Sequence, residues 1–173
     1  MSVFKSVIVT GANRGLGLEL VQQLASKSSC LSVIATCRDP DQAQTLLKIR
    51  DEHQDKVHVH KLELNDIDSY PDFLEEIKSQ LDSLGVSCLI NNAGVAPKAT
   101  RYNLVKVEQM EQTFKTNVIA PLFLSRAFIP YLKESKDSVI LNMSSSLGTV
   151  NFFQVQSQIR PCNSGLSEGA GAE

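Results

Sequence analysis

The segment Thr10–Gly17, with the sequence TGANRGLG, has residues that could bind a pyrophosphate. It follows a short β-branched apolar run, Val3–Val9, and precedes a helix whose apolar residues recur at three- and four-residue spacing. Glycines let such a loop turn tightly, and backbone amides at the start of a helix attract negative charge. The segment therefore predicts a dinucleotide site, although a glycine loop can also serve helix packing alone. The residues of this loop predicted to contact the cofactor are Gly11, Asn13, Arg14, Gly15, Leu16 and Gly17.

A second polar segment, Asn91–Gly94 with the sequence NNAG, directly follows an apolar run that ends at Ile90. In open α/β sheets, ligands bind beyond the carboxyl ends of the strands. We therefore expect this segment to face the same crevice as the glycine loop. The residues predicted to contact the cofactor here are Asn92, Ala93 and Gly94.

The choice of cofactor depends on the residues after the second predicted strand, Thr36-Cys37-Arg38. An NAD enzyme places Asp or Glu there to bind the ribose hydroxyls, and no carboxylate precedes Arg38. Arg38 and Arg14 could instead pair bidentately with a 2′-phosphate, which predicts NADP(H) as the cofactor. A solvated surface charge is the alternative for either arginine.

Apolar runs and helical stripes alternate along the chain, as expected of repeated β-α units. The predicted strands are residues 3–9, 31–36, 57–64, 86–90 and 138–143, and the predicted helices begin near Gly15 and Asp39 and cover 74–84 and 106–132. Asp39-Pro40-Asp41-Gln42 offers an N-cap, a first-turn proline and a capping-box Gln. Pro121 is expected to bend the last helix. The predicted fold is α/β, a doubly wound parallel sheet that is Rossmann-like and truncated after the fifth strand.

The length of 173 residues with 42% hydrophobic residues fits a single core. We expect an NADP(H)-binding domain of the Rossmann type at residues 1–150 and a divergent, disordered tail at 151–173, which is rich in Gln, Ser and Gly. A net charge of −2 without a basic run argues against nucleic-acid and anionic-membrane partners. With neither a signal-peptide pattern nor a long apolar segment, the expected location is cytoplasmic, with reduced cysteines.

Taken together, the patterns TGxxxGxG and NNAG at this separation resemble the short-chain dehydrogenase/reductase family. The resemblance runs from about Val3 to about Val150, and LNMSS at Leu141–Ser145 looks closest to NADPH-dependent carbonyl reductases of the sniffer type. It implies an NADP(H)-dependent oxidoreductase that transfers hydride to a small-molecule carbonyl compound, with the corresponding alcohol as the other substrate.

The resemblance also implies roles for single residues. Family members use an Asn in the fourth helix and a Ser after the fifth strand, and the predicted catalytic residues Asn117 and Ser145 occupy these places. Glu63 and Leu64 stand where relatives often have Asp and an apolar residue beside the adenine. A serine at this edge could hydrogen-bond a substrate carbonyl. Ordinary turn chemistry for the serine, and repair of an unpaired backbone group by Asn117, are the alternatives.

The family's proton donor, the tyrosine of a Tyr-x-x-x-Lys pattern after the serine, has no match, because residues 146–173 contain neither Tyr nor Lys. Tyr102 and Lys106 have the right spacing but precede Asn117, so we do not assign them this role. Without general-acid assistance, hydride transfer loses roughly 10²- to 10⁴-fold in rate, and negligible turnover is expected of this chain alone. Relatives usually dimerise through the fourth and fifth helices, and the absence of the fifth argues against an oligomer.

Two other hypotheses stay open. The chain could be a catalytically inactive cofactor-binding or interaction variant, or an unstable truncated product, including an erroneous gene model. The predicted fifth strand would present apolar residues at an uncovered edge. His58 and His60 share one face of a predicted strand, but no third ligand completes a set, so no metal site is predicted.

Overall fold

The computed structural model describes residues 4–96, 102–135 and 137–145. The chain divides into two compact units, Met1–Met143 and Ser144–Glu173. Of the second unit the structure describes Ser144 and Ser145, which are both exposed. The elements below belong to the first unit.

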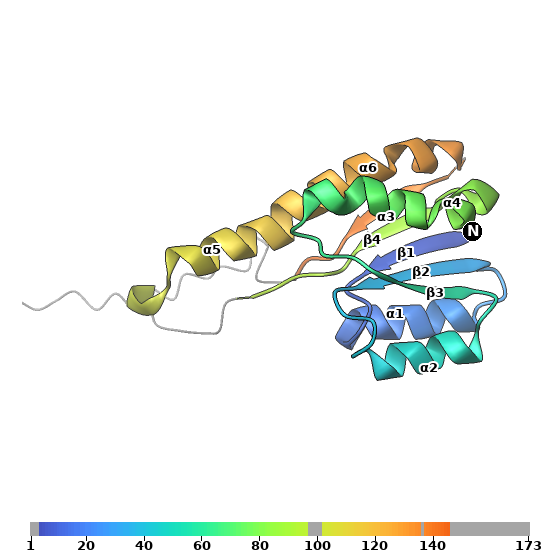
Figure 1. The fold of residues 1–173 in the computed structure, drawn as a ribbon, viewed down its shortest axis with the longest axis horizontal. Helices are drawn as coiled ribbons and strands as arrows, with labels where there is room; N and C mark the ends of the chain where they lie inside the picture. Colours follow the sequence, from blue (N-terminus) through green and yellow to red (C-terminus); the bar gives the residue numbers. More distant parts are fainter. Residues whose placement is uncertain (1–3, 97–101, 136, 146–173) are drawn as a thin grey trace, which may run out of the picture. The chain divides into compact units, whose positions relative to one another are not determined.

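Five parallel strands form one sheet in the order β3-β2-β1-β4-β5 (Figure 1). Their bounds are β1 Ser6–Thr10, β2 Ser32–Cys37, β3 Val57–Lys61, β4 Cys88–Asn91 and β5 Val139–Asn142. The chain adds strands on one side of β1 and then on the other, so the direction of winding reverses between β1 and β4. That reversal point is where open α/β sheets bind ligands, at the carboxyl ends of the strands.

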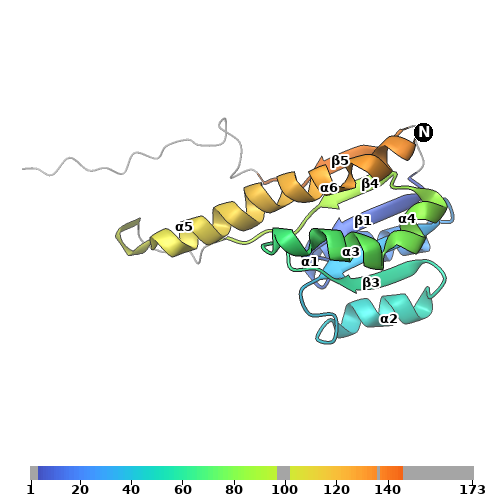
Figure 2. The same ribbon diagram turned by 45° about the horizontal axis from the view of Figure 1, so that its top comes forward.

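Helices cover both faces of the sheet, as Figures 1 and 2 show. One face carries α1 (Gly15–Ser26) and α2 (Gln44–Glu52), and the other carries α3 (Tyr70–Glu76), α4 (Lys78–Leu84) and α6 (Ala120–Glu134). The predicted class, a doubly wound parallel sheet, is confirmed.

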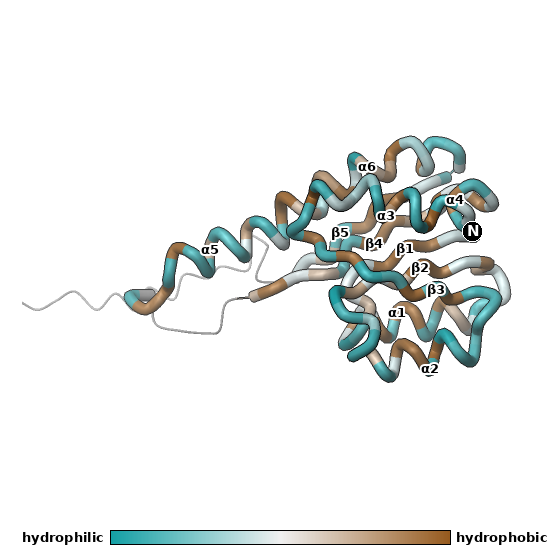
Figure 3. The backbone as a smooth tube through the Cα atoms, viewed as in Figure 1, coloured by the Kyte–Doolittle hydropathy of each residue, from teal (hydrophilic) through white to brown (hydrophobic). Residues whose placement is uncertain are grey.

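Two apolar clusters hold these layers together, one on each face. Alternate residues of β1 enter different clusters: Val7 and Val9 pack with α1 and α2, whereas Ile8 packs with the opposite helices. Every residue of β1 and β2 is buried, which explains why their sequences read as continuous apolar runs. Figure 3 shows hydrophobic residues along these central strands.

Several predicted boundaries were wrong. The second helix begins at Gln44 rather than near Asp39, because Pro40 O accepts a turn hydrogen bond from Ala43 N at 2.9 Å. Strand β3 ends at Lys61 rather than at residue 64. The predicted helix over 74–84 is two helices, α3 and α4, which meet at Ile77 after a 3₁₀ turn at Ile67–Ser69.

The predicted helix over residues 106–132 is α5 (Val107–Phe114), a π-helical turn (Lys115–Ile119) and α6, with a 3₁₀ turn at Tyr102–Leu104 before it. The irregular turn directly precedes Pro121, which has no N–H to donate, so the expected disturbance takes the form of a wider turn. Buried residues of α6 face the sheet, whereas an apolar stripe on the other side is exposed. The stripe comprises Val107, Met110, Phe114, Val118 and Leu122.

β5 lies at one edge of the sheet, where Ile140 is 38% and Leu141 41% exposed. Cys30, Cys37 and Cys88 are free and buried, while Cys162 lies outside the described residues. Across residues 4–96, 102–135 and 137–145, none of the helices combines the length and apolar character that crossing a membrane requires.

Candidate functional site

A cavity of about 590 Å³ opens at the carboxyl ends of the central strands. It is lined by Gly11, Asn13, Arg14, Gly15, Leu16, Thr36, Cys37, Arg38, Leu62, Glu63, Leu64, Asn65, Asn92, Ala93, Gly94, Val95, Gln112 and Thr116. Of the twelve residues predicted to contact the cofactor, Gly17 is absent from this lining. Five separate segments therefore meet where the winding of the sheet reverses.

The glycine loop runs from the end of β1 into the first turn of α1. Gly11 (φ +66°) and Gly15 (φ +57°) have left-handed backbones, which residues with a Cβ adopt at a cost. Arg14 is the N-cap and makes no side-chain cap hydrogen bond, and the first turn of α1 holds no acidic residue. The positive end of the helix is thus available to an anion in the cavity.

Gly17 serves packing instead of lining the cavity. A Cβ on this residue would overlap the carbonyl oxygen of Gly11 and the side-chain nitrogen of Asn92. That nitrogen, Nδ2, donates to Thr10 O at 2.9 Å and to Gly11 O at 3.3 Å. The third glycine of the loop therefore lets the NNAG segment reach the glycine loop.

Thr10 joins the same two segments and was missed as a site residue. Its hydroxyl accepts hydrogen bonds from Asn92 N at 3.0 Å and Ala93 N at 3.1 Å, and it donates to Ile90 O at 3.3 Å. Thr10 is 2% exposed, so these backbone amides have a partner that water could not replace. Its position before Gly11 was the available sequence signal.

Arg14 and Arg38 both line the cavity and are exposed. The ion pairs within the described part of the chain involve neither of them. Neither guanidinium group has a carboxylate partner among the described residues, so both stay available to a phosphate, although Glu63 also lines the cavity. Cys37 lies beside them, and burial raises the pKa of its thiol.

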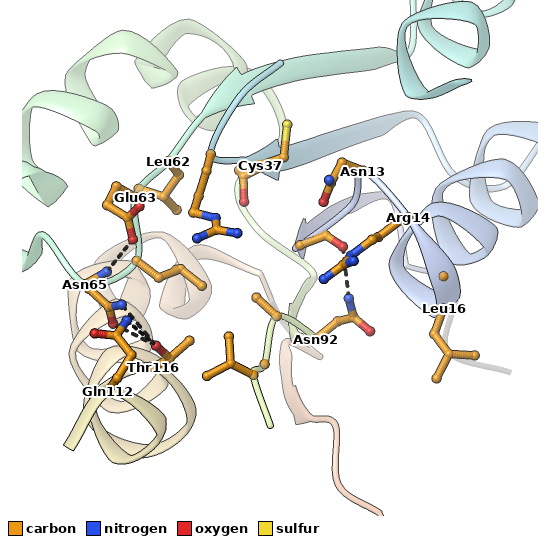
Figure 4. A pocket seen from close by; sticks show the side chains of 18 residues that line it. Asn13, Arg14, Leu16, Cys37, Leu62, Glu63, Asn65, Asn92, Gln112 and Thr116 are labelled. Atoms are coloured by element: carbon orange, nitrogen blue, oxygen red, sulfur yellow. Dashed lines mark hydrogen bonds between the residues drawn. The ribbon is translucent and has the colours of Figure 1, made fainter. Parts of the chain in front are cut away.

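The other wall is built by residues after β3 and on the π-helical turn, several of which were missed. Figure 4 shows Arg14 and Leu16 on one side and Asn65, Gln112 and Thr116 on the other. Asn65 Nδ2 donates to Thr116 Oγ1 at 3.0 Å, and Thr116 Oγ1 lies 3.1 Å from Asn65 Oδ1. Gln112 Nε2 donates to the same hydroxyl at 3.4 Å. The Asn65–Thr116 contact joins segments 51 residues apart, so no local pattern contains it, whereas Gln112 and Thr116 lie four residues apart on one helical stretch.

Glu63 was predicted to lie beside the adenine, and it lines the cavity together with Leu64. Its Oε1 accepts a hydrogen bond from the backbone N of Asn65 at 3.2 Å. Leu64 is 9% exposed, and its carbonyl accepts the hydroxyl of Tyr70 at 2.6 Å. The buried Tyr70 therefore holds the backbone of this wall in place through its hydrogen bond to Leu64 O.

Asn117 lies on the π-helical turn outside the cavity lining. Its Oδ1 accepts from Val95 N at 2.9 Å, and its Nδ2 donates to Val95 O at 2.7 Å. The side chain thus joins the π-helical turn between α5 and α6 to the segment after β4. The pairing is compatible with the alternative in which Asn117 satisfies backbone groups, and the catalytic role of Asn117 stays a prediction.

Ser145 is the second residue of the second unit and is exposed, and its catalytic role likewise stays a prediction. Lys106, which we declined as a catalytic lysine, is the N-cap of α5, where its backbone N donates to Gln109 Oε1 at 3.1 Å. This position is consistent with a helix start.

The two histidines of β3 lie at a second hollow, away from the glycine loop. His60 Nδ1 lies 2.6 Å from Glu76 Oε1, and burial lowers the pKa of His58. Among the residues that the structure describes, no three His, Cys, Asp or Glu side chains are arranged to hold a metal ion.

Comparisons with known proteins agree with this geometry. A family model described as short chain dehydrogenase matches residues 5–157. (+)-Neomenthol dehydrogenase of Arabidopsis thaliana is 32% identical over 162 residues, which cover 82% of this chain and 53% of that protein.

Two solved structures are also similar. The carbonyl reductase Sniffer of D. melanogaster has a TM-score of 0.82 at 31% identity, over 87% of this chain and 65% of that one. An NADPH-bound carbonyl reductase from chicken fatty liver has a TM-score of 0.81 at 37% identity, over 87% of this chain and 63% of that one. The chain spans about half the length of the curated relatives it matches.

Proposed function

The chain belongs to the short chain dehydrogenase family, a family of oxidoreductases, and from this premise we propose that its cavity binds NADP(H). The carrying observation is the pair Arg14 and Arg38, which line the cavity beside the amino terminus of α1. A helix terminus suits the pyrophosphate, and two arginines that form no ion pair among the described residues suit a 2′-phosphate. The NADPH bound by the chicken carbonyl reductase supports the same cofactor.

The proposed reaction is hydride transfer between NADP(H) and a small carbonyl compound, with Ser145 hydrogen-bonding the carbonyl oxygen and Asn117 as a second catalytic residue. The similar carbonyl reductases support this substrate class. The nicotinamide supplies the hydride, and this chain's own residues bind and orient the cofactor. A cytoplasmic setting stays part of the proposal, as the sequence patterns predict.

A second candidate is a cofactor-binding variant without turnover. It is favoured by one observation: residues 146–173, which follow Ser145, contain no Tyr and no Lys. Without a positioned proton donor, reduction of a carbonyl proceeds without general-acid assistance and is slower. We therefore expect this chain alone to bind NADPH and to turn over dicarbonyl substrates negligibly.

NADPH fluorescence titration of the purified chain tests the proposal, with NADH as the comparison. Arg38→Ala should weaken NADPH binding at least about tenfold and leave NADH binding nearly unchanged, because only NADPH carries the 2′-phosphate. Arg50→Ala is the matched control, since Arg50 is an arginine outside the cavity that pairs with Asp51 at 2.7 Å. A folded chain that binds neither nucleotide contradicts the proposal, and measurable reduction of a dicarbonyl contradicts the expected loss of turnover.

A further inference from the structure

α5 is a short helix that contributes no buried residue to the apolar clusters of the fold. The structure describes all of Val107–Phe114, and none of these residues is buried. The helix contacts mainly the π-helical turn that follows it. In Figures 1 and 2 it extends beyond the carboxyl ends of the strands. A helix of this length is marginal in water, because most helix stability in proteins comes from packing an apolar face.

The polar contacts of α5 lead to the nucleotide cavity. Gln112 lies on α5, lines the cavity and donates to Thr116 Oγ1 at 3.4 Å, a long and therefore weak hydrogen bond. Thr116 lies on the π-helical turn, is 7% exposed and is bonded to Asn65, so it holds this turn against the segment after β3. Gln112 is exposed, which leaves its amide available to a ligand.

We propose that nucleotide binding stabilises α5: a nucleotide in the cavity contacts the Gln112 amide, and this contact exists only when α5 is helical. The inference rests on the proposed function, since it requires a nucleotide in this cavity. A ligand shifts a conformational equilibrium only through different affinities for the two states, and the Gln112 contact supplies that difference. By linkage, changes that raise the helical fraction of α5 raise the apparent nucleotide affinity until the helix is fully formed.

The coupling reaches the predicted catalytic region through the π-helical turn. Thr116 ties this turn to Asn65, and the next residue, Asn117, ties it to Val95. α5 enters the turn directly, so a bound nucleotide orders the chain that leads into Asn117. Cofactor binding thereby controls whether the segment that leads into Asn117 is ordered.

Amide hydrogen exchange of the whole chain, with and without saturating NADPH, tests the proposal. Exchange across residues 109–115 should slow at least about tenfold when NADPH binds. α2 is the internal control, because it has similar length, buries Leu46 and Ile49 and contributes no residue to the cavity. Its amides should change much less, which separates a local effect from general stabilisation by a ligand.

Two adjacent substitutions separate the coupling from helix propensity. Gln112→Ala and Glu111→Ala both place alanine on the exposed surface of α5, but Gln112 alone lines the cavity. Gln112→Ala should abolish most of the NADPH-dependent slowing in α5, whereas Glu111→Ala should retain it. Saturation is confirmed in the same samples by NADPH fluorescence.

Equal exchange of α5 with and without NADPH, at proven saturation, overturns this inference alone. The same holds if Gln112→Ala retains the full slowing. If a folded chain fails to bind NADPH at any concentration, the proposed function fails and the inference fails with it, so the fluorescence signal distinguishes the two failures.

Discussion

The side-chain amide of Asn92 occupies the space that a Cβ on Gly17 would need. This contact brings the segment after β4 against the first turn of α1, 75 residues earlier in the chain by the difference of their numbers. The crevice between β1 and β4 therefore depends on a residue that does not touch the cavity.

Gly17→Ala should destabilise the fold and weaken nucleotide binding, because the new Cβ would overlap the backbone carbonyl oxygen of Gly11 and the side-chain nitrogen of Asn92. We expect a loss of about 1–3 kcal/mol in the free energy of unfolding, as for other overpacked sites. Gly94→Ala is the control, since its Cβ would meet Asn117 Oδ1 at an ordinary 3.4 Å. Urea denaturation measures the free energy of unfolding of both variants. Equal values would contradict a steric overlap of a Cβ at position 17.

Thr10→Val should cost roughly 1–3 kcal/mol, because the backbone amides of Asn92 and Ala93 lose their shared acceptor in a buried place. Valine has nearly the same shape, so little packing is lost. Thr10→Ser keeps the hydroxyl and should lose clearly less. A Thr10→Val chain as stable as the Thr10→Ser chain would mean that water replaces the hydroxyl.

Tyr70 should make stability fall at alkaline pH. Burial, with the nearby charges of Glu63 and Asp66, raises its pKa from 10.0 to about 12. The raised pKa means that the unfolded chain loses this proton first, so stability is full below pH 10 and declines as pH rises toward 12.

The decline attributable to Tyr70 should be on the order of 2–3 kcal/mol, from a shift of about two units in a residue that is 3% exposed. The Tyr70→Phe variant also loses the hydrogen bond to Leu64 O, so its free energy of unfolding should be lower than that of the unmodified chain at pH 8. The difference between the two chains should shrink or reverse by pH 12. If the difference in free energy of unfolding between the two chains is the same at every pH, the pKa of Tyr70 is not raised by folding.

Phe128→Ala should remove about 3–5 kcal/mol, because Phe128 is fully buried between Phe73 and Tyr131, with ring centroids 6.3 Å away on either side. Phe114→Ala is the matched control on the same helical stretch. Phe114 is 55% exposed, so its loss should stay within about 0.5 kcal/mol. Thermal unfolding of both variants provides the comparison, and similar losses would mean that Phe114 packs against something in solution.

Much of the fold could be predicted because its signals are local. The apolar runs of β1 and β2 and the glycine loop indicate parallel strands and a nucleotide site without any knowledge of distant contacts. Boundaries were less certain where capping patterns compete with turns, as at Asp39-Pro40-Asp41-Gln42, where a turn forms and the helix begins later.

The candidate site divides in the same way. Eleven of the twelve residues predicted to contact the cofactor line the cavity, because loops after parallel strands must meet at one edge of the sheet. Asn65 and Thr116 were missed since their importance arises from a mutual contact across 51 residues of chain, and Gln112 was missed since only the position of α5 brings it to the cavity. Gly17 was predicted to contact the cofactor as the last glycine of the TGxxxGxG pattern, and the structure shows that it also leaves space for the Asn92 amide.

The amino-acid sequence by itself determined the strand and helix pattern, the glycine loop, the two arginines and the absence of Tyr and Lys after Ser145. These features depend on residue type and short-range spacing. Only the tertiary structure decided which polar groups satisfy one another: Thr10 with the NNAG backbone, Thr116 with Asn65, and Asn117 with Val95. Thr10 and Thr116 are buried, and the partner that folding brings within reach of each lies far along the chain.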